Sequence, residues 1–254
     1  MGVLTDKVAL VTGASRGIGA VTAQVLAERG AWVAVSGRTL PDLEKVAAQI
    51  RNGGSHGLPV QCDATDAVQV QKMVDRVVAE WGRLDILVNN AGMGRPAMPV
   101  EEIPPDEWDN TLVLNLKSTF LSVRSAAPIM KRQKYGRIVN MSSFSGRNYA
   151  RFGSAAYAAA KAGLLGFTRQ MAQELGPHGV CVNSVAPNII MTVRAKADWS
   201  TMTEERRNSI LSGIPLHRLA EPREIATVIA FLSSDDASYV NGVCIDINGG
   251  SYMT

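Results

Sequence analysis

The sequence predicts a doubly wound α/β fold, with one parallel sheet of about seven strands and helices on both faces. Short apolar runs alternate with longer stretches of helical periodicity along the whole chain, which is typical of repeated βα units. The apolar runs show little in/out alternation, as a sheet covered on both faces requires. No linker or change in composition divides the 254 residues. We therefore predict a single domain over residues 1–254.

The predicted elements follow one another in a regular order. Apolar runs predict strands over 7–12, 31–36, 57–62, 84–90, 136–142, 180–186 and 242–247. Helical spacing of apolar side chains predicts helices over 17–29, 41–51, 66–81, 105–130, 154–175 and 222–232. The more polar stretch 192–212 follows the sixth strand and is a candidate for a helical substrate lid.

Composition and charge narrow the classes of function. The chain is 46% hydrophobic and 19% charged, which is ordinary for a soluble globular protein. We see neither a signal peptide nor a membrane-spanning run, so we expect a cytoplasmic protein without a membrane partner. Lys and Arg are scattered at a net charge of +3, which indicates no nucleic-acid partner. The three cysteines are far apart and the histidines do not cluster, so we predict buried thiols and no metal site.

A glycine loop joins the first predicted strand to the first helix. Gly13, Gly17 and Gly19 stand in the run TGASRGIG, where a buried strand gives way to a helix. Glycines let the backbone approach a pyrophosphate, and the helix N-terminus offers free N–H groups and a positive dipole. The loop predicts dinucleotide binding, although a glycine-rich turn without a ligand is the alternative.

The end of the second strand indicates which dinucleotide is bound. An acidic residue there would accept hydrogen bonds from an adenosine ribose, whereas an arginine favours a 2′-phosphate. The chain has Arg38 at this point and a second arginine, Arg16, in the glycine loop. Each alone is more often a solvated surface charge, but a guanidinium matches phosphate oxygens and two are placed around one expected site. We therefore predict NADP(H) in preference to NAD(H).

Five motifs occur in order along the chain: TGASRGIG, NNAG at 89–92, VLNLKS at 113–118, NMSS at 140–143 and YAAAK at 157–161. With them the chain resembles the short-chain dehydrogenase/reductase family, from about Val3 to Gly250. The resemblance implies a Rossmann-type sheet. Within the family, the chain resembles the 3-oxoacyl-thioester reductases in the segment IPLHRLAEPREIA and in the spacing of Tyr157 and Lys161. The acyl-carrier-protein enoyl reductases of the family have a longer Tyr–Lys spacing.

The resemblance implies a role for each matching residue. Tyr157 would be the general acid or base, and Lys161, four positions later on the same helical face, would lower its pKa. Ser143 would hydrogen-bond the substrate oxygen, and Asn115 would hold a water of a proton relay. The residues implied in cofactor binding are Gly13, Ser15, Arg16, Gly17, Ile18, Gly19, Arg38, Asp63, Asn89, Ala91, Gly92, Tyr157, Lys161, Pro187 and Thr192.

Some of these roles have structural alternatives. Asn115 is also consistent with a core amide bonded to backbone. Asp63 is also consistent with a helix N-cap, a role that Thr65 or Asp66 could fill instead.

The chain departs from the family pattern at two positions. Ser143 precedes Tyr157 by fourteen positions, one more than is usual, so Ser142 and Ser145 stay open as alternatives to it. After the sixth strand, Asn188 follows Pro187 where the family usually has glycine. The contacts of this turn are therefore left open.

The predicted activity is hydride transfer between NADPH and a small-molecule ketone or secondary alcohol, with a 3-oxoacyl thioester as one candidate substrate. Segments 92–98 and 144–153 and the lid candidate would bound the pocket, and Arg95, Arg147 and Arg151 are candidates to read an anionic group. The alternatives are a non-catalytic dinucleotide-binding regulator, an NAD-dependent dehydrogenase of a sugar or steroid-like alcohol, and a nucleotide-sugar epimerase or dehydratase.

The resemblance also implies a homotetramer or homodimer, with the helices around Asn115 and Tyr157 at the interface. Small residues on the second of these helices would permit close helix approach, and ordinary packing on the sheet is the alternative. They are Ala155, Ala158, Ala159, Ala162 and Gly166.

Overall fold

The computed structural model describes residues 2–94, 96–150 and 153–253. Their sheet has seven strands in the order β3-β2-β1-β4-β5-β6-β7, and each neighbouring pair is parallel. This is the predicted doubly wound sheet. The strands are β1 (Val8–Thr12), β2 (Trp32–Gly37), β3 (Gly57–Gln61), β4 (Ile86–Asn89), β5 (Gly136–Met141), β6 (Val180–Pro187) and β7 (Cys244–Ile247).

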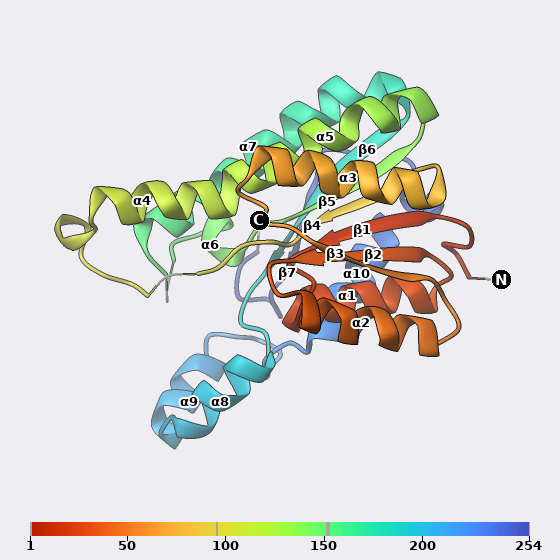
Figure 1. The fold of residues 1–254 in the computed structure, drawn as a ribbon. Helices are drawn as coiled ribbons and strands as arrows, with labels where there is room; N and C mark the ends of the chain where they lie inside the picture. Colours follow the sequence, from red (N-terminus) through yellow and green to blue (C-terminus); the bar gives the residue numbers. More distant parts are fainter. Residues whose placement is uncertain (1, 95, 151–152, 254) are drawn as a thin grey trace.

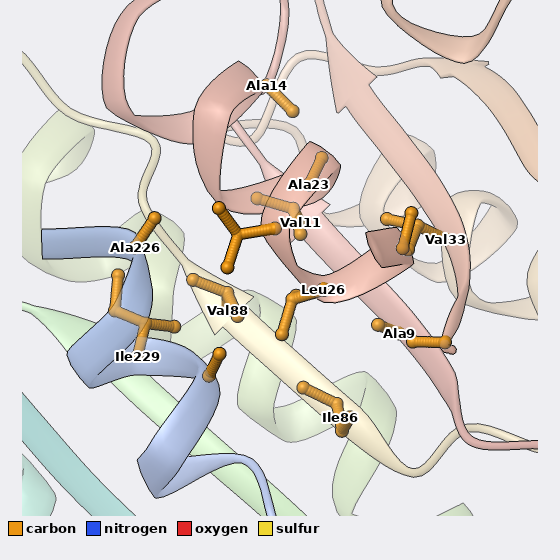
Figure 2. Packing of buried hydrophobic residues seen from close by; sticks show 14 of the residues in the cluster. Ala9, Val11, Ala14, Ala23, Leu26, Val33, Ile86, Val88, Ala226 and Ile229 are labelled. Carbon is orange, nitrogen blue, oxygen red and sulfur yellow. The ribbon is translucent and has the colours of Figure 1, made fainter. Parts of the chain in front are cut away.

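Two layers of helices cover the sheet (Figure 1). One face carries α1 (Gly17–Glu28), α2 (Leu40–Asn52) and α10 (Pro222–Leu232), and the other carries α3 (Ala67–Trp81), α5 (Ser118–Gln133) and α7 (Ala155–Leu175). Each layer encloses its own apolar core. Figure 2 shows the first core, where Val11 and Val88 of the sheet meet Leu26 of α1 and Ile229 of α10.

The strands divide their side chains between the two cores. Ala9 and Val11 point into the core under α1, whereas Val8 and Leu10 point into the core under α3. Successive strand residues face opposite sides of a sheet, and both sides are buried here. That is why the sequence shows continuous apolar runs without alternation.

One predicted helix is built from three pieces. The segment expected as a single helix over 105–130 consists of α4 (Pro105–Leu112), a π-helical turn (Val113–Lys117) and α5. A π turn adds a residue to the ring closed by each hydrogen bond, and such turns often occur at functional sites. Periodicity over so short a stretch could not predict it.

The predicted lid segment contains two helices. They are α8 (Val193–Thr201) and α9 (Glu204–Leu211), which project away from the sheet (Figure 1). They share a small apolar cluster that includes Trp199, Ile210 and Ile214. An isolated bridge between Ile190 and Ala220 joins the two chain segments at the base of these helices. Their action as a lid stays a prediction.

The remaining short elements are α6 (Phe144–Arg147) and three 3₁₀ turns, Val100–Glu102, Gly176–His178 and Asp235–Ala237. Cys62 and Cys181 are buried free thiols as predicted, and Cys244 is half-buried. Among the described residues, no helix combines the length and the apolar character that crossing a membrane needs.

Candidate active site

A cavity of ≈ 290 Å³ opens at the carboxyl ends of β1, β2, β3 and β4. The chain changes direction across the sheet between β1 and β4, and ligands of open α/β sheets bind at such switch points. Predicted cofactor residues line much of the cavity, namely Gly13, Ser15, Arg16, Ile18, Arg38, Asp63, Ala91, Gly92 and Thr192. Met93, from the segment 92–98 predicted to bound the pocket, also lines the cavity, whereas sequence reasoning missed other lining residues, among them Thr12, Ser36, Asn90 and Leu114.

The glycine loop works through its backbone. Gly13 and Gly17 have φ values of +63° and +61°, in the left-handed region that side chains disfavour. A Cβ on Gly13 would lie 2.9 Å from the Cα of Ala91. Gly19 has another purpose, because a Cβ there would overlap the Gly13 carbonyl oxygen. Gly17 and Gly19 therefore shape the turn and its packing and do not line the cavity.

Two arginines face the cavity from different segments. Arg16 is the N-cap residue of α1 without a side-chain cap bond, and Arg38 follows β2; both are exposed and line the cavity. The Thr65 backbone N–H and hydroxyl donate to the Asp63 carboxylate at 2.9 and 2.7 Å. These bonds, with Arg38, hold the pKa of Asp63 below its usual value. The cap of α3 is Asp66, so Asp63 does not serve as the helix cap.

The structure corrects the prediction for Asn89. Its side chain is buried and donates to Asn140 Oδ1 at 2.9 Å, away from the cavity. The next residue, Asn90, lines the cavity and donates to the carbonyl oxygens of Thr12 and Gly13, both at 3.0 Å. Strand alternation is the reason, since Asn89 still belongs to β4 and points to the sheet face opposite Val88.

The two residues after the sixth strand behave differently from each other. Pro187 is the buried last residue of β6 and is not among the lining residues of the cavity. Thr192 lines the cavity and caps α8, with its Oγ1 accepting from the Ala195 N–H at 3.2 Å. Thr192 therefore lies at the cavity and Pro187 lies outside its lining, and the cofactor contacts of both residues stay a prediction.

The first turns of α7 bring the tyrosine and the lysine to the carboxyl end of β5. Ser154 caps α7 by accepting from the Tyr157 backbone N–H. Lys161, one turn further on, is buried and donates from Nζ to the Met141 carbonyl oxygen at 2.7 Å. Its Nζ lies 5.7 Å from the centroid of the Tyr157 ring. The predicted pair therefore shares one helix face.

The geometry distinguishes the candidate serines. Ser142 is buried and its hydroxyl donates to the Lys161 backbone carbonyl at 2.8 Å. Ser143 instead acts on the side chain of Tyr157, whose pKa it helps to lower, and its Oγ accepts from the Ser145 N–H at 3.2 Å. The extra residue between Ser143 and Tyr157 does not prevent their contact.

Asn115 is held in the π turn by backbone groups. Its Nδ2 donates to the carbonyl oxygens of Met93 and Thr111, and its Oδ1 accepts from the Met93 N–H at 3.0 Å. A Cβ on Gly92 would lie 2.7 Å from Asn115 Oδ1 and 3.3 Å from Lys161 Nζ. Only glycine fits between these two side chains. The amide is thus bonded to backbone, and its relay role stays a prediction.

Burial shifts both titrating groups of the pair. It raises the pKa of Tyr157, and the hydrogen bond with Ser143 only partly opposes the rise. Burial also lowers the pKa of Lys161 to about 8, because it disfavours the ammonium. The expected net lowering of the Tyr157 pKa is therefore wrong: desolvation raises this pKa, and the Lys161 ammonium, which donates to Met141, does not outweigh the rise. A phenol that keeps its proton at neutral pH suits a proton donor.

The structure also corrects the prediction for Arg147. Both oxygens of Asp246 accept hydrogen bonds from its guanidinium, at 3.1 to 3.2 Å. An arginine already paired in this way is a poor reader of an anionic substrate. Arg95 and Arg151, the other two candidates, lie outside the described residues.

Comparisons with known proteins agree with this geometry. A family model described as enoyl-(acyl carrier protein) reductase matches residues 13–252. The chain is 41% identical to the 3-oxoacyl-(acyl-carrier-protein) reductase FabG of Staphylococcus aureus, over 97% of this chain and 98% of that protein. The chain belongs to the short-chain dehydrogenase/reductase family. As a member of this family, it is an NAD(P)-dependent oxidoreductase that acts on C=O and CH–OH groups.

Solved structures of the short-chain dehydrogenase/reductase family superpose closely on the chain. A 3-oxoacyl-(acyl-carrier protein) reductase from Brucella melitensis has a TM-score of 0.92 at 34% identity, covering 99% of this chain and 93% of that one. Levodione reductase has a TM-score of 0.91 at 34% identity, covering 97% and 98%. The family's fold and the Rossmann-type sheet are thus shared along the whole chain.

Proposed function

We propose that this protein is an NADPH-dependent reductase of 3-oxoacyl thioesters. The observation that carries the proposal is the grouping of Ser143 and Lys161 around Tyr157: Ser143 acts to lower the pKa of Tyr157, and Lys161 Nζ lies 5.7 Å from the centroid of its ring. Full-length relatives named 3-oxoacyl-(acyl-carrier-protein) reductase support the substrate class, at 41% identity in Staphylococcus aureus and 37% in Escherichia coli. The intact residue set argues against a regulator that has lost its chemistry.

The cavity residues fit a dinucleotide. Gly13 leaves room that a Cβ would fill, and the first N–H groups of α1 offer partners to a pyrophosphate. We assign Arg16 and Arg38 to the 2′-phosphate, because both residues line the cavity and no acidic side chain follows Gly37 at the end of β2. NADPH is therefore the preferred cofactor, and when bound it supplies the hydride.

The protein's own residues handle the oxygen of the substrate. The Ser143 hydroxyl hydrogen-bonds the ketone oxygen and stabilises the charge that develops on it. Tyr157 gives its phenolic proton to that oxygen as the carbon is reduced. Lys161 stabilises the phenolate that remains, because its ammonium is an opposite charge in a buried site. Asn115 then takes part in returning a proton to Tyr157.

The reaction type follows from the same side chains. The matching family model is described as an enoyl reductase, which would reduce a carbon–carbon double bond. Two features support a ketone instead: the four-residue spacing of Tyr157 and Lys161 resembles that of the family's 3-oxoacyl reductases, and Ser143 acts on the proton donor Tyr157. Activity on a sugar or steroid-like alcohol is the alternative that the substrate test below would reveal.

We also propose a cytoplasmic homotetramer, with α5 and α7 at one interface. The small residues Ala159, Ala162 and Gly166 are exposed on α7, so they do not serve packing on the sheet. Phe120 of α5 is 44% exposed and meets Phe167 of α7 edge to face. Such an apolar patch with small neighbours suits another helix pair. Light scattering after size-exclusion chromatography tests the assembly, and a monomer would contradict it.

The proposed function is tested by offering NADPH or NADH with a panel of 3-oxoacyl thioesters, simple ketones and diketones. Oxidation of the cofactor is followed by its near-ultraviolet absorbance. We expect turnover with NADPH and 3-oxoacyl thioesters, strongly reduced in Tyr157→Phe and unchanged in Tyr239→Phe, a fully exposed tyrosine. Equal loss in both variants, or preference for NADH, would contradict the proposal.

A further inference from the structure

The short helix α6 determines where the Ser143 hydroxyl lies. Ser143 is the N-cap residue of α6, and its Oγ accepts from the Ser145 N–H. On the other side α6 presses on α7, where a Cβ on Gly146 would lie 2.6 Å from the Lys161 carbonyl oxygen. One helical turn has little stability of its own. Contacts from elsewhere must hold α6, and with it Ser143, in place.

Those contacts come from the end of the chain. Arg147, the last residue of α6, forms a bidentate ion pair with Asp246 of β7. The two side chains are 22% and 20% exposed. The guanidinium carbon lies 5.4 Å from the centroid of the Tyr252 ring, and Phe144 meets the same ring edge to face at 6.4 Å. Both ends of α6 therefore rest on the segment that starts with Asp246.

The segment that carries Tyr252 is itself fixed. Asn188 donates from Nδ2 to Ser251 Oγ at 3.0 Å. Asn248 donates to the Tyr252 carbonyl oxygen at 3.0 Å and accepts from the Gly250 N–H at 2.9 Å. Asn188, which stands where the family usually has glycine, therefore has a structural role: its amide bonds the loop after β6 to the C-terminal segment. A mobile tail could not position α6, and this one is bonded at both ends.

We propose that Arg147, Asp246 and Tyr252 form a C-terminal clamp that positions Ser143 against Tyr157. They are positioning residues: none of them lines the cofactor cavity, and their side-chain contacts in the described part of the chain join them to one another and to Phe144. A planar guanidinium bound bidentately fixes orientation as well as distance. To hydrogen-bond a substrate oxygen that develops negative charge, the Ser143 hydroxyl needs both the correct distance and the correct orientation. The kinetic part of this proposal rests on the proposed function, and the structural part does not.

The structural part is tested by hydrogen exchange of the backbone amides at 143–148 in the full-length protein. Asp246→Asn removes the charge at constant size, and Glu28→Gln is the matched control, because Glu28 forms a bidentate pair with Arg223 that joins α1 to α10. We expect faster exchange at 143–148 in Asp246→Asn and wild-type exchange there in Glu28→Gln. Unchanged exchange in Asp246→Asn, or equal acceleration in both variants, overturns the clamp.

The kinetic part uses the same variant with and without Ser143. We expect Asp246→Asn to lower kcat about tenfold, while the dissociation constant of NADPH stays within about twofold. In a Ser143→Ala background the further loss of kcat should be under about twofold, because the clamp acts through that serine. Asp246→Glu, which keeps the charge, should restore part of kcat.

Equal loss of kcat in the two backgrounds would overturn a role through Ser143. An unchanged kcat in Asp246→Asn would overturn it as well. If the wild-type protein reduces no ketone, the proposed function fails, and the exchange experiment alone still decides whether the clamp exists.

Discussion

The two halves of the site are built in different ways. The cofactor half, at the ends of β1 to β4, consists of short segments that each follow their own strand, and it works largely through backbone and small residues. The chemical half joins Ser143 after β5, Tyr157 on α7 and Asn115 in a π turn. It depends on side chains from distant segments held in register. Local sequence therefore determines the structure of the cofactor half, whereas the chemical half depends on how distant segments pack together.

Lys161 belongs to both halves, so its loss should have the largest effect. Lys161→Met removes the positive charge that stabilises the phenolate and one of the residues predicted to bind the cofactor. We expect kcat to fall about 10³-fold and NADPH binding to weaken together with it. Steady-state kinetics and a fluorescence titration with NADPH measure the two effects. If Lys161→Met kept a nearly normal kcat, Lys161 would have no role in the chemical half of the site.

Ser143 should affect only the chemical half. Ser143→Ala removes a hydrogen bond to the developing oxyanion, so we expect kcat to fall about 10²-fold with NADPH binding unchanged. Ser142→Ala is the matched control: its hydroxyl donates to the Lys161 backbone carbonyl, and we expect a loss of stability of about 1 kcal/mol with a much smaller change in kcat. The reverse ranking of the two serines would refute the assignment.

Arg38 should affect only the cofactor half. Arg38→Asp replaces a phosphate partner by a group that repels phosphate and accepts from a ribose hydroxyl. We expect the NADPH-to-NADH ratio of kcat/KM to fall by about 10- to 100-fold, while kcat with NADPH at saturation changes little. Arg132→Asp, an exposed arginine outside the cavity, is the control. An unchanged ratio in Arg38→Asp would remove the basis for NADPH preference.

The pH dependence of the reaction should report the charge of Lys161. Burial lowers the pKa of Lys161 to about 8, so the ammonium is present below that pH and is lost as the pH rises through it. We expect kcat/KM for ketone reduction to fall by up to about tenfold per unit above pH 8, since kcat/KM reports groups of the free enzyme. NADPH binding at the arginine end should keep its strength over the same range. A profile that stays flat to about pH 9 would contradict the lowered pKa of Lys161 or the need for its charge, because an ordinary lysine stays charged to a higher pH.

Sequence reasoning reached the cofactor half more completely than the chemical half. The order of strands and helices, the glycine loop, Arg16 and Arg38 all follow from local patterns, and the structure gathers them at one cavity. The prediction at Asn89 was wrong by one position, because the NNAG motif spans the end of β4 and Asn89, the last strand residue, points away from the cavity. Its neighbour Asn90 could have been found from that alternation alone.

The chemical half contains features that no local pattern encodes. The π turn around Asn115 and the ion pair of Arg147 with Asp246 depend on segments that meet only after folding. The pKa of Tyr157 rises because of burial, which the spacing of two residues on a helix cannot reveal. The sequence predicted which residues the chemical half brings together, but it could not predict the raised pKa of Tyr157 or the contacts that support Ser143.

The most direct test of the account follows the hydrogen that is transferred. NADPH labelled with deuterium at its transferable position is given to the protein with a 3-oxoacyl thioester and a 2-enoyl thioester in competition, and both products are analysed by mass spectrometry. We predict deuterium on the carbinol carbon of the 3-hydroxyacyl product and none in a saturated acyl chain. Deuterium in the saturated chain, or in neither product, would contradict ketone reduction by Ser143, Tyr157 and Lys161.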